Sequence, residues 1–213
     1  MTRAILKPFG PSILKTSIPQ NIIEALNLHI DNIVSSTKKS KELDFGQSLA
    51  GNVQQEFKLE PEFIKKSGWG KHLMEETKIW IEQLNKNPIN NMSMCLVDNF
   101  KILETWIVRQ FENEYNPAHY HLGHISGVGY LKIPDDLGPT VQQNKVNQNG
   151  HLHLIHGSKQ FLSNVVLDVK PKVGDLYLFP AYLVHTVYPF KNKNLERRSI
   201  SFNALINEET FNN

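Results

Sequence analysis

A series of short β-type runs begins near residue 90 and limits the folds that this chain can adopt. Each run is rich in β-branched or aromatic residues and is bounded by Gly, Pro, Asn or Asp, which is typical of short strands joined by turns. Seven or more such strands in succession predict an antiparallel sandwich or a jelly-roll barrel. The runs include "MSMCLVDNF", "KILETWIVRQF", "ISGVGYLKIP", "GHLHLIHGS", "NVVLDVKP", "DLYLFP" and "RRSISFNALI".

The first part of the chain has a different periodicity. Apolar residues recur at helical spacing in residues 20–35 and again in residues 70–86, which predicts two amphipathic helices. His29 and His72 are lone histidines within these helices, and we expect both at the surface or at the boundary of the core.

A chain of 213 residues suits one domain, and the order of the elements shows no alternation of strands and helices. We therefore predict an α+β fold and a single domain over residues 1–213. Residues 1–90 are expected to form a helical N-terminal support, and residues 91–207 the β-barrel core against which it packs.

Charge and cysteine content restrict the partners and the location. The net charge of +2 gives no electrostatic reason to expect nucleic acid or an anionic membrane. Cys95 is the one cysteine, so internal disulfides are excluded and a reducing compartment is favoured. The first twenty residues contain no long apolar run, so a secretory signal or a membrane span is not expected. A cytoplasmic location is the simplest interpretation.

Six of the nine histidines fall in two hexapeptides of the form His-x-His-x-x-His, at residues 119–124 and 151–156. In an extended chain, residues two apart point to the same face. His119 and His121 can therefore bind one metal ion, and a third ligand must come from elsewhere. His124 follows a glycine, and we expect it in the turn before the next strand, pointing away from that face.

A candidate third ligand lies in "VGDLYLFPAYLVHTVYPF". Gly174-Asp175 signals a turn and Pro180 ends the strand that follows, so His185 falls on the next strand. A lone histidine in a strand is more often structural than metal-binding, but the preceding His-x-His favours the second interpretation for His185.

The strand predicted over residues 197–205 has two different faces. An arginine and a hydroxyl two residues apart on the polar face could bind a carboxylate, because arginine offers a bidentate fork and serine one more donor. The alternative is a half-solvated strand. The polar face holds Arg197, Ser199, Ser201 and Asn203, and the other holds Arg198, Ile200, Phe202 and Ala204.

Taken together, these motifs resemble those of the iron(II)/2-oxoglutarate-dependent oxygenases, most nearly the oxygenases found in phages and marine bacteria. That group shows a His-x-His followed by a "SGVYYL"-like strand, an "LFPSWLxH"-like segment and "RxSxSFN". The counterparts here are "HYHLGHISGVGYL", "LYLFPAYLVH" and "RRSISFN". The resemblance covers about residues 100–207.

The resemblance implies a double-stranded β-helix with supporting N-terminal helices, in the cytoplasm of a bacterium or of a phage-infected bacterium. It implies Fe(II) held by His119, His121 and His185. It also implies 2-oxoglutarate as cosubstrate, with its distal carboxylate on Arg197 and Ser199, and with Tyr130 as a further donor. With O2, such an enzyme hydroxylates a substrate and releases succinate and CO2. The sequence carries no pattern that identifies this small-molecule or protein substrate, or the oligomeric state.

One departure from the wider superfamily concerns the metal ligands. The usual triad is His-x-Asp/Glu…His, and here His121 occupies the carboxylate position, which raises the net charge of the centre by one. The phage-like group shares this histidine. Asp135, Asp136 and Asp175 do not have a spacing that would replace the missing carboxylate.

Two other functions remain open from the sequence. A cupin-like metalloenzyme uses the same barrel and a Pro-x-x-Gly-Asp turn such as "PKVGD", but it usually carries a Glu soon after His-x-His, and it needs neither 2-oxoglutarate nor Arg-x-Ser. The other alternative is a non-enzymatic jelly-roll module for ligand binding or interaction.

For the second histidine hexapeptide we predict no metal. His151 and His153 alternate with leucines, which is the pattern of a strand with one polar face, and His156 next to a glycine is expected at a strand end. An alternative is that His151 or His153 lines the same pocket without binding iron. The polar segment 134–150 is expected to connect two strands, either as an exposed loop or as part of a lid.

Overall fold

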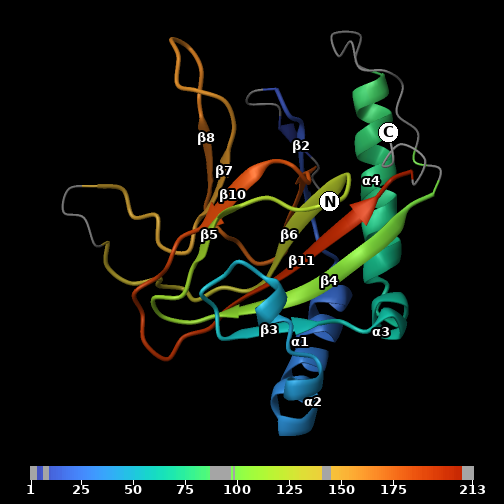
Figure 1. Ribbon diagram of the computed structural model, residues 1–213, viewed down its shortest axis with the longest axis vertical. Helices are drawn as coiled ribbons and strands as arrows, with labels where there is room; N and C mark the ends of the chain where they lie inside the picture. Colours follow the sequence, from blue (N-terminus) through green and yellow to red (C-terminus); the bar gives the residue numbers. More distant parts are fainter. Residues whose placement is uncertain (1–3, 7–9, 87–96, 98, 141–144, 208–213) are drawn as a thin grey trace.

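The computed structural model describes residues 4–6, 10–86, 97, 99–140 and 145–207. Two antiparallel sheets face each other, and helices cover the outer face of the larger sheet (Figure 1). This arrangement is the predicted α+β architecture.

The major sheet has seven strands. β11 lies near its centre. It pairs along most of its length with β4 on one side and with β6 on the other. In spatial order the strands are β1 (Ala4–Leu6), β2 (Ile13–Ser17), β9 (Asp175–Pro180), β6 (Ile125–Lys132), β11 (Arg197–Leu205), β4 (Lys101–Gln110) and β3 (Gln55–Lys58).

The minor sheet has four strands, and apolar side chains from both sheets, among them Tyr130, Leu154 and Phe179, form one buried cluster. In this sheet His185 pairs with His119 on one neighbouring strand and with Leu154 on the other. The order is β5 (Asn116–His119), β10 (Val184–Val187), β7 (Leu152–Ile155) and β8 (Val166–Val169).

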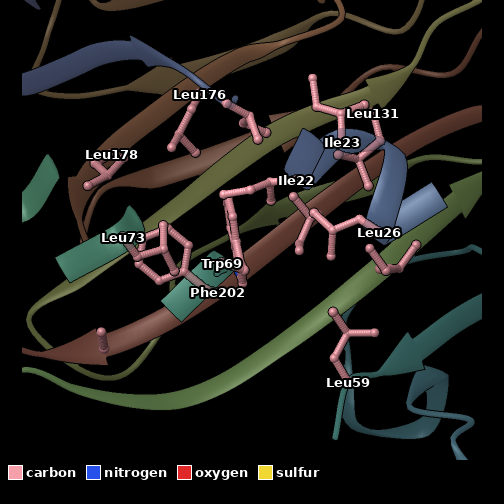
Figure 2. Packing of buried hydrophobic residues seen from close by; sticks show 14 of the residues in the cluster. Ile22, Ile23, Leu26, Leu59, Trp69, Leu73, Leu131, Leu176, Leu178 and Phe202 are labelled. Atoms are coloured by element: carbon pink, nitrogen blue, oxygen red, sulfur yellow. The ribbon is translucent and has the colours of Figure 1, made fainter. Parts of the chain in front are cut away.

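Helices cover the opposite face of the major sheet because their apolar stripes match its outer face. The stripe of the first helix and that of the last pack on the outward residues of β11, and Trp69 meets Phe202 edge-on with ring centroids 6.2 Å apart (Figure 2). The helical elements are α1 (Gln20–Val34), α2 (Thr37–Glu42), the short 3-10 helix η1 (Gly46–Ser48), α3 (Pro61–Lys66) and α4 (Trp69–Asn85).

β6 needs glycine where it passes β11. A Cβ on Gly127 would lie 2.5 Å from a ring carbon of Phe202 and 2.6 Å from the carbonyl oxygen of Tyr177. A larger residue would push these strands apart, so the "SGVGY" run sets the spacing of the sheet that carries Tyr130.

Several sequence predictions need correction. Residues 1–90 are not purely helical, because β1, β2 and β3 from this part join the major sheet. The short strands β1 and β2 were missed because their apolar residues do not alternate. His72 is only 7% exposed and its ring lies 6.3 Å from that of Trp69, one turn earlier in α4, so the expected boundary position is wrong for this residue.

Two further predictions concern His29 and the run "MSMCLVDNF". His29 is half-buried as expected, stacks on Phe63 with ring centroids 3.6 Å apart, and lies 3.0 Å from Glu60. Most of the run "MSMCLVDNF", including Cys95, lies outside the described residues.

Candidate metal centre

Three histidines from the minor sheet converge between the two sheets. His119 ends β5, His121 lies two residues beyond it, and His185 lies on β10. One nitrogen from each ring lies within 4.8 Å of the others. Among the described residues, this is the one group of three His, Cys, Asp or Glu side chains close enough to hold a metal ion.

The pairing of the strands explains this convergence. His119 and His185 face each other across β5 and β10, and their ring centroids are 4.3 Å apart. The His121 ring is 4.9 Å from that of His119 and 5.0 Å from that of His185. The amide of His121 donates to the carbonyl oxygen of Ala181 at 2.9 Å, which fixes the segment beyond the end of β5.

Hydrogen bonds orient two of the three rings. Nδ1 of His119 lies 2.6 Å from the carbonyl oxygen of Pro117, and Nδ1 of His185 lies 2.9 Å from that of Leu183. A carbonyl can only accept, so each Nδ1 carries the proton and each Nε2 keeps a free lone pair. This is the arrangement in which histidine binds a metal.

Burial keeps the three imidazoles neutral. Burial lowers the pKa of His119, lowers that of His121 to about 4 and lowers that of His185 to about 3, and mutual repulsion of neighbouring imidazolium charges adds to the last two shifts. At neutral pH the site therefore offers three uncharged nitrogen donors, which suit a first-row transition metal.

A narrow cavity extends from the histidines to the start of β11. Its volume is about 40 Å3, and Trp106, Phe179 and Leu152 form apolar walls, while Arg197 and Ser199 supply polar groups. This is the space of about one water molecule, so a larger ligand requires these side chains to move apart.

Arg197 is buried, and no carboxylate of the described residues pairs with it. Its side chain is fully enclosed, with the residue only 1% exposed, and burial lowers its pKa. Nη1 donates to Oγ of Ser199 at 3.3 Å, but Nε and Nη2 have no hydrogen-bond partner among the described residues. Since an unpaired buried cation costs several kcal/mol, these atoms point to an anionic ligand.

Tyr130 lies beside this guanidinium. The guanidinium carbon of Arg197 is 5.2 Å from the centre of the Tyr130 ring, and the tyrosine hydroxyl also lacks a partner among the described residues. Burial raises the pKa of Tyr130, so the phenol stays protonated and can donate. Tyr130 and Arg197 therefore present unmatched donors, and the hydroxyl of Ser199 lies beside them; this set fits a carboxylate.

Arg198 faces the other side of β11, as the predicted alternation requires. Nε of Arg198 donates to Glu196 at 2.7 Å, and Nη2 donates to Asp31 of α1 at 2.7 Å. Glu196 also accepts from Arg109 at 2.6 Å and from Lys132 at 3.2 Å. Arg198 thus has carboxylate partners that Arg197 lacks.

The second histidine hexapeptide forms a separate group. His151 and His153 approach one carboxylate, that of Asp168, at 2.7 Å and 3.3 Å, and His153 contacts Tyr188 with ring centroids 4.5 Å apart. The alternating Leu152 lines the cavity, so the two histidines point to the outer face of the minor sheet, and neither lines the cavity. The alternative that one of them does is wrong.

The remaining sequence candidates also lie outside this cavity. His124 is not among the three converging histidines, and its Nδ1 accepts from the amide of Ile206 at 3.1 Å. Asp175 pairs with Lys15 at 3.0 Å, and neither Asp135 nor Asp136 lines the cavity.

Sequence reasoning did not assign several residues that line the cavity, and Trp106 and Asn116 are two of them. The signal for Trp106 is the alternation in "KILETWIVRQF", where Trp106 and Val108 share the inner face and Ile107 packs in the helical layer. Asn116 begins β5 before a proline, and the sequence gives no sign that its side chain reaches the site.

Comparison with known families decides the class. Residues 104–203 match the family model described as "Putative 2OG-Fe(II) oxygenase". Residues 104–203 belong to the 2OG-Fe(II) oxygenases. The match spans β4 to β11 and therefore contains all three histidines, Tyr130 and the Arg-x-Ser pair. The matched part is accordingly that of an oxidoreductase of the 2-oxoglutarate-dependent class, which uses iron(II), 2-oxoglutarate and O2 as cofactor and cosubstrates.

Solved structures show that the 2OG-Fe(II) oxygenase fold extends over most of the chain. A prolyl-4-hydroxylase from Pseudomonas putida is 16% identical with a TM-score of 0.56, covering 90% of this chain and 91% of its own. The viral collagen prolyl hydroxylase of Paramecium bursaria Chlorella virus-1, solved as a 2OG complex, is 16% identical with a TM-score of 0.52, covering 90% and 94%.

A third similar structure is a prolyl hydroxylase from Trichoplax adhaerens in complex with a hypoxia inducible factor peptide fragment, which is 13% identical with a TM-score of 0.54 and coverage of 93% and 84%. These likenesses establish the fold, which is the predicted double-stranded β-helix. A comparison with curated proteins found no match. Within the described residues, no helix is both long and apolar enough to cross a membrane.

Proposed function

We propose that His119, His121 and His185 bind the iron and that the chain hydroxylates an unactivated C–H bond of a small molecule or a peptide. In this reaction the substrate, O2 and 2-oxoglutarate give the hydroxylated substrate, succinate and CO2. One oxygen atom enters the substrate and the other enters succinate, and the oxidation of the keto acid supplies two electrons.

The observation that carries the proposal is the placement of two complementary groups in one cavity. Three neutral imidazoles with free lone pairs stand on β5, its extension and β10, and Arg197, a buried cation with no carboxylate partner in the described part of the chain, stands on the major sheet. A keto acid with a second carboxylate fits both, because one end can chelate a metal and the other can pair with a guanidinium.

In this proposal, each of the site residues named above has a defined role. Arg197 and Ser199 bind the distal carboxylate, and the protonated phenol of Tyr130 is close enough to the guanidinium to donate to the same group. The carbonyl oxygens of Pro117 and Leu183 hold the rings of His119 and His185 in the metal-binding tautomer. The iron, when bound, supplies the activation of O2.

The apolar walls have a role as well. Phe179 and Leu152 are almost fully buried beside the histidines. They exclude water from the site, which strengthens the ion pair between Arg197 and a carboxylate and limits side reactions.

Anaerobic spectroscopy tests the proposal. Addition of 2-oxoglutarate to the Fe(II)-loaded protein should produce the weak visible charge-transfer band of a chelated keto acid, with one keto acid bound per chain. Admission of O2 should then yield succinate, with faster turnover when a substrate is present. The absence of the band together with no measurable 2-oxoglutarate affinity would contradict this function.

A further inference from the structure

A second recess, of about 160 Å3, adjoins the cavity of the three histidines. Trp106, Asn116, His119 and His121 line both spaces, whereas Arg197 lines only the first. The recess therefore reaches the metal-binding nitrogens from a side that the carboxylate-binding group does not occupy.

The outer wall of the recess is the end of η1 and the residues after it, Ser48 to Ala50. Hydrogen bonds hold this loop at both ends. The amide of Phe45 donates to the carbonyl oxygen of Glu56 at 2.8 Å, and that of Asn52 donates to Tyr115 at 2.8 Å. The wall is thus tied to β3 and to the residue before β5, and it keeps a defined distance from the histidines.

The contact of Gly51 with Asn116 fixes the inner end of the loop. A Cβ on Gly51 would lie 2.8 Å from Nδ2 of Asn116, so the loop backbone packs directly on this amide. Asn116 lines both the recess and the cavity, so the position of the loop and the shape of the recess depend on this side chain.

The side chains that line the recess are uncharged. Leu49, Ala50 and Trp106 give apolar surface, and the hydroxyl of Ser48 and the amide of Asn116 are neutral. No carboxylate, ammonium or guanidinium lines it among the described residues. A charged group that entered would lose hydration without gaining a partner.

We propose that this recess receives the part of the substrate that is oxidised, and that this part is a small, uncharged, aliphatic group. This inference rests on the function proposed above. At about 30 Å3 per water molecule, the recess holds roughly five waters, which is the space of an aliphatic side chain of about five heavy atoms. Leu49 and Ala50 then set its depth and act as specificity-determining residues.

Two sources can present such a group: a free metabolite of amino-acid size, or a residue within a peptide. The mouth of the recess is bordered by Tyr120, whose residue is 65% exposed, so the remainder of either molecule can lie outside. Matched free and capped ligands distinguish the two sources.

Ligand NMR with Mn(II) in place of iron tests the inference without catalysis. The Mn(II)-loaded chain with saturating 2-oxoglutarate is mixed with free L-leucine, L-lysine or L-glutamate, and in a second series with their N-acetyl amides. Paramagnetic relaxation of side-chain protons reports closeness to the metal. We expect leucine protons, in at least one series, to relax at least ten times more strongly than those of lysine or glutamate.

Three variants sharpen this result. Ala50→Leu should fill the recess and reduce the relaxation of the leucine ligand at least tenfold, while 2-oxoglutarate still binds. Ser48→Asp should make the lysine ligand the preferred one, and this gain decides the matter if Ala50→Leu fails to fold. Leu28→Ala, at an exposed position on α1, is the control and should match the wild type.

The outcomes separate the two proposals. If 2-oxoglutarate protons show no relaxation by Mn(II) in the wild type, the proposed function itself fails. If 2-oxoglutarate is relaxed, equal or stronger relaxation of charged ligands, no relaxation of any ligand, or an unchanged leucine signal in Ala50→Leu would each overturn the assignment of the recess.

Discussion

His119 and His185 are direct neighbours across β5 and β10, and their ring centroids lie 4.3 Å apart. The convergence of these two rings, on which the proposed metal site depends, is therefore a property of strand register in the minor sheet. A shift of one residue would turn one of the two side chains to the opposite face, so the pairing of these strands and the binding of metal depend on each other.

The first prediction concerns metal content. His185→Ala and the double variant His119→Ala/His121→Ala should each lower bound iron from about one per chain to less than a tenth, because two imidazoles or one cannot retain Fe(II) against dilution. Metal analysis after desalting measures this.

The second histidine hexapeptide supplies the matched control. The double variant His151→Ala/His153→Ala should keep about one iron per chain, because these rings approach Asp168 on the outer face. Loss of metal in this variant, with the fold intact by circular dichroism, would show that the metal site has been assigned to the wrong hexapeptide.

The second prediction separates two adjacent arginines. Arg197→Ala should weaken 2-oxoglutarate binding at least tenfold and leave iron in place, because it removes the cation that faces the cavity. Arg198→Ala should leave 2-oxoglutarate affinity within about twofold but destabilise the fold by about 3 kcal/mol, since it breaks the buried pair with Glu196. Calorimetric titration and urea unfolding measure the two effects, and a reversed order would contradict the orientation of β11.

The third prediction concerns stability in acid. Burial alone would raise the pKa of Glu196, but hydrogen bonds from Arg109 and Arg198 outweigh it and hold the pKa at about 2, below the ordinary 4.5. A depressed folded-state pKa contributes stability above pH 4.5 that is lost as pH falls toward 2. This contribution amounts to about 3 kcal/mol.

Glu196→Gln tests the sign of this effect. Its unfolding free energy should fall less steeply than that of the wild type between pH 4.5 and pH 2, and it should be lower than the wild type at pH 7. Urea unfolding at a series of pH values provides the comparison, and parallel curves would show that Glu196 does not carry the effect.

The fourth prediction concerns Glu56, a fully buried carboxyl on β3. Burial raises its pKa to about 7, and repulsion by Glu114 and Asp44 acts in the same direction. The folded state therefore keeps a proton that the unfolded state releases above pH 4.5, so stability should decrease as pH rises toward 7. The loss is about 2–3 kcal/mol.

Glu56→Gln should remove this dependence and be more stable than the wild type at pH 8, because the amide has no charge to desolvate. Thermal unfolding at pH 5 and at pH 8 makes the comparison. An equal loss of stability in both proteins over this range would count against a raised pKa at Glu56.

Local periodicity predicted much of the fold and of the candidate site. The alternation in "RRSISFNAL" places Arg197 and Ser199 toward the cavity and Ile200 and Phe202 in the helical layer, as the structure has them. The His-x-His spacing predicts the convergence of His119 and His121 because it depends only on extended backbone.

Long-range features were not predictable in this way. β3 is a short edge strand whose pairing with β4 joins segments about fifty residues apart, and nothing in "QEFK" signals that partner. The proximity of the loop at Leu49 to His121 depends on the same pairing. The burial of His72 depends on tertiary packing around α4, which a helical stripe alone does not define.

The two halves of the proposed ligand set stand on opposite walls of the barrel. The histidines belong to β5, its extension and β10, while Arg197 and Ser199 belong to β11 of the facing sheet. A bound keto acid must bridge the gap between these walls. The separation of the two sheets therefore selects the length of the dicarboxylate that can bind. We therefore expect oxaloacetate, which is one carbon shorter than 2-oxoglutarate, to bind more weakly.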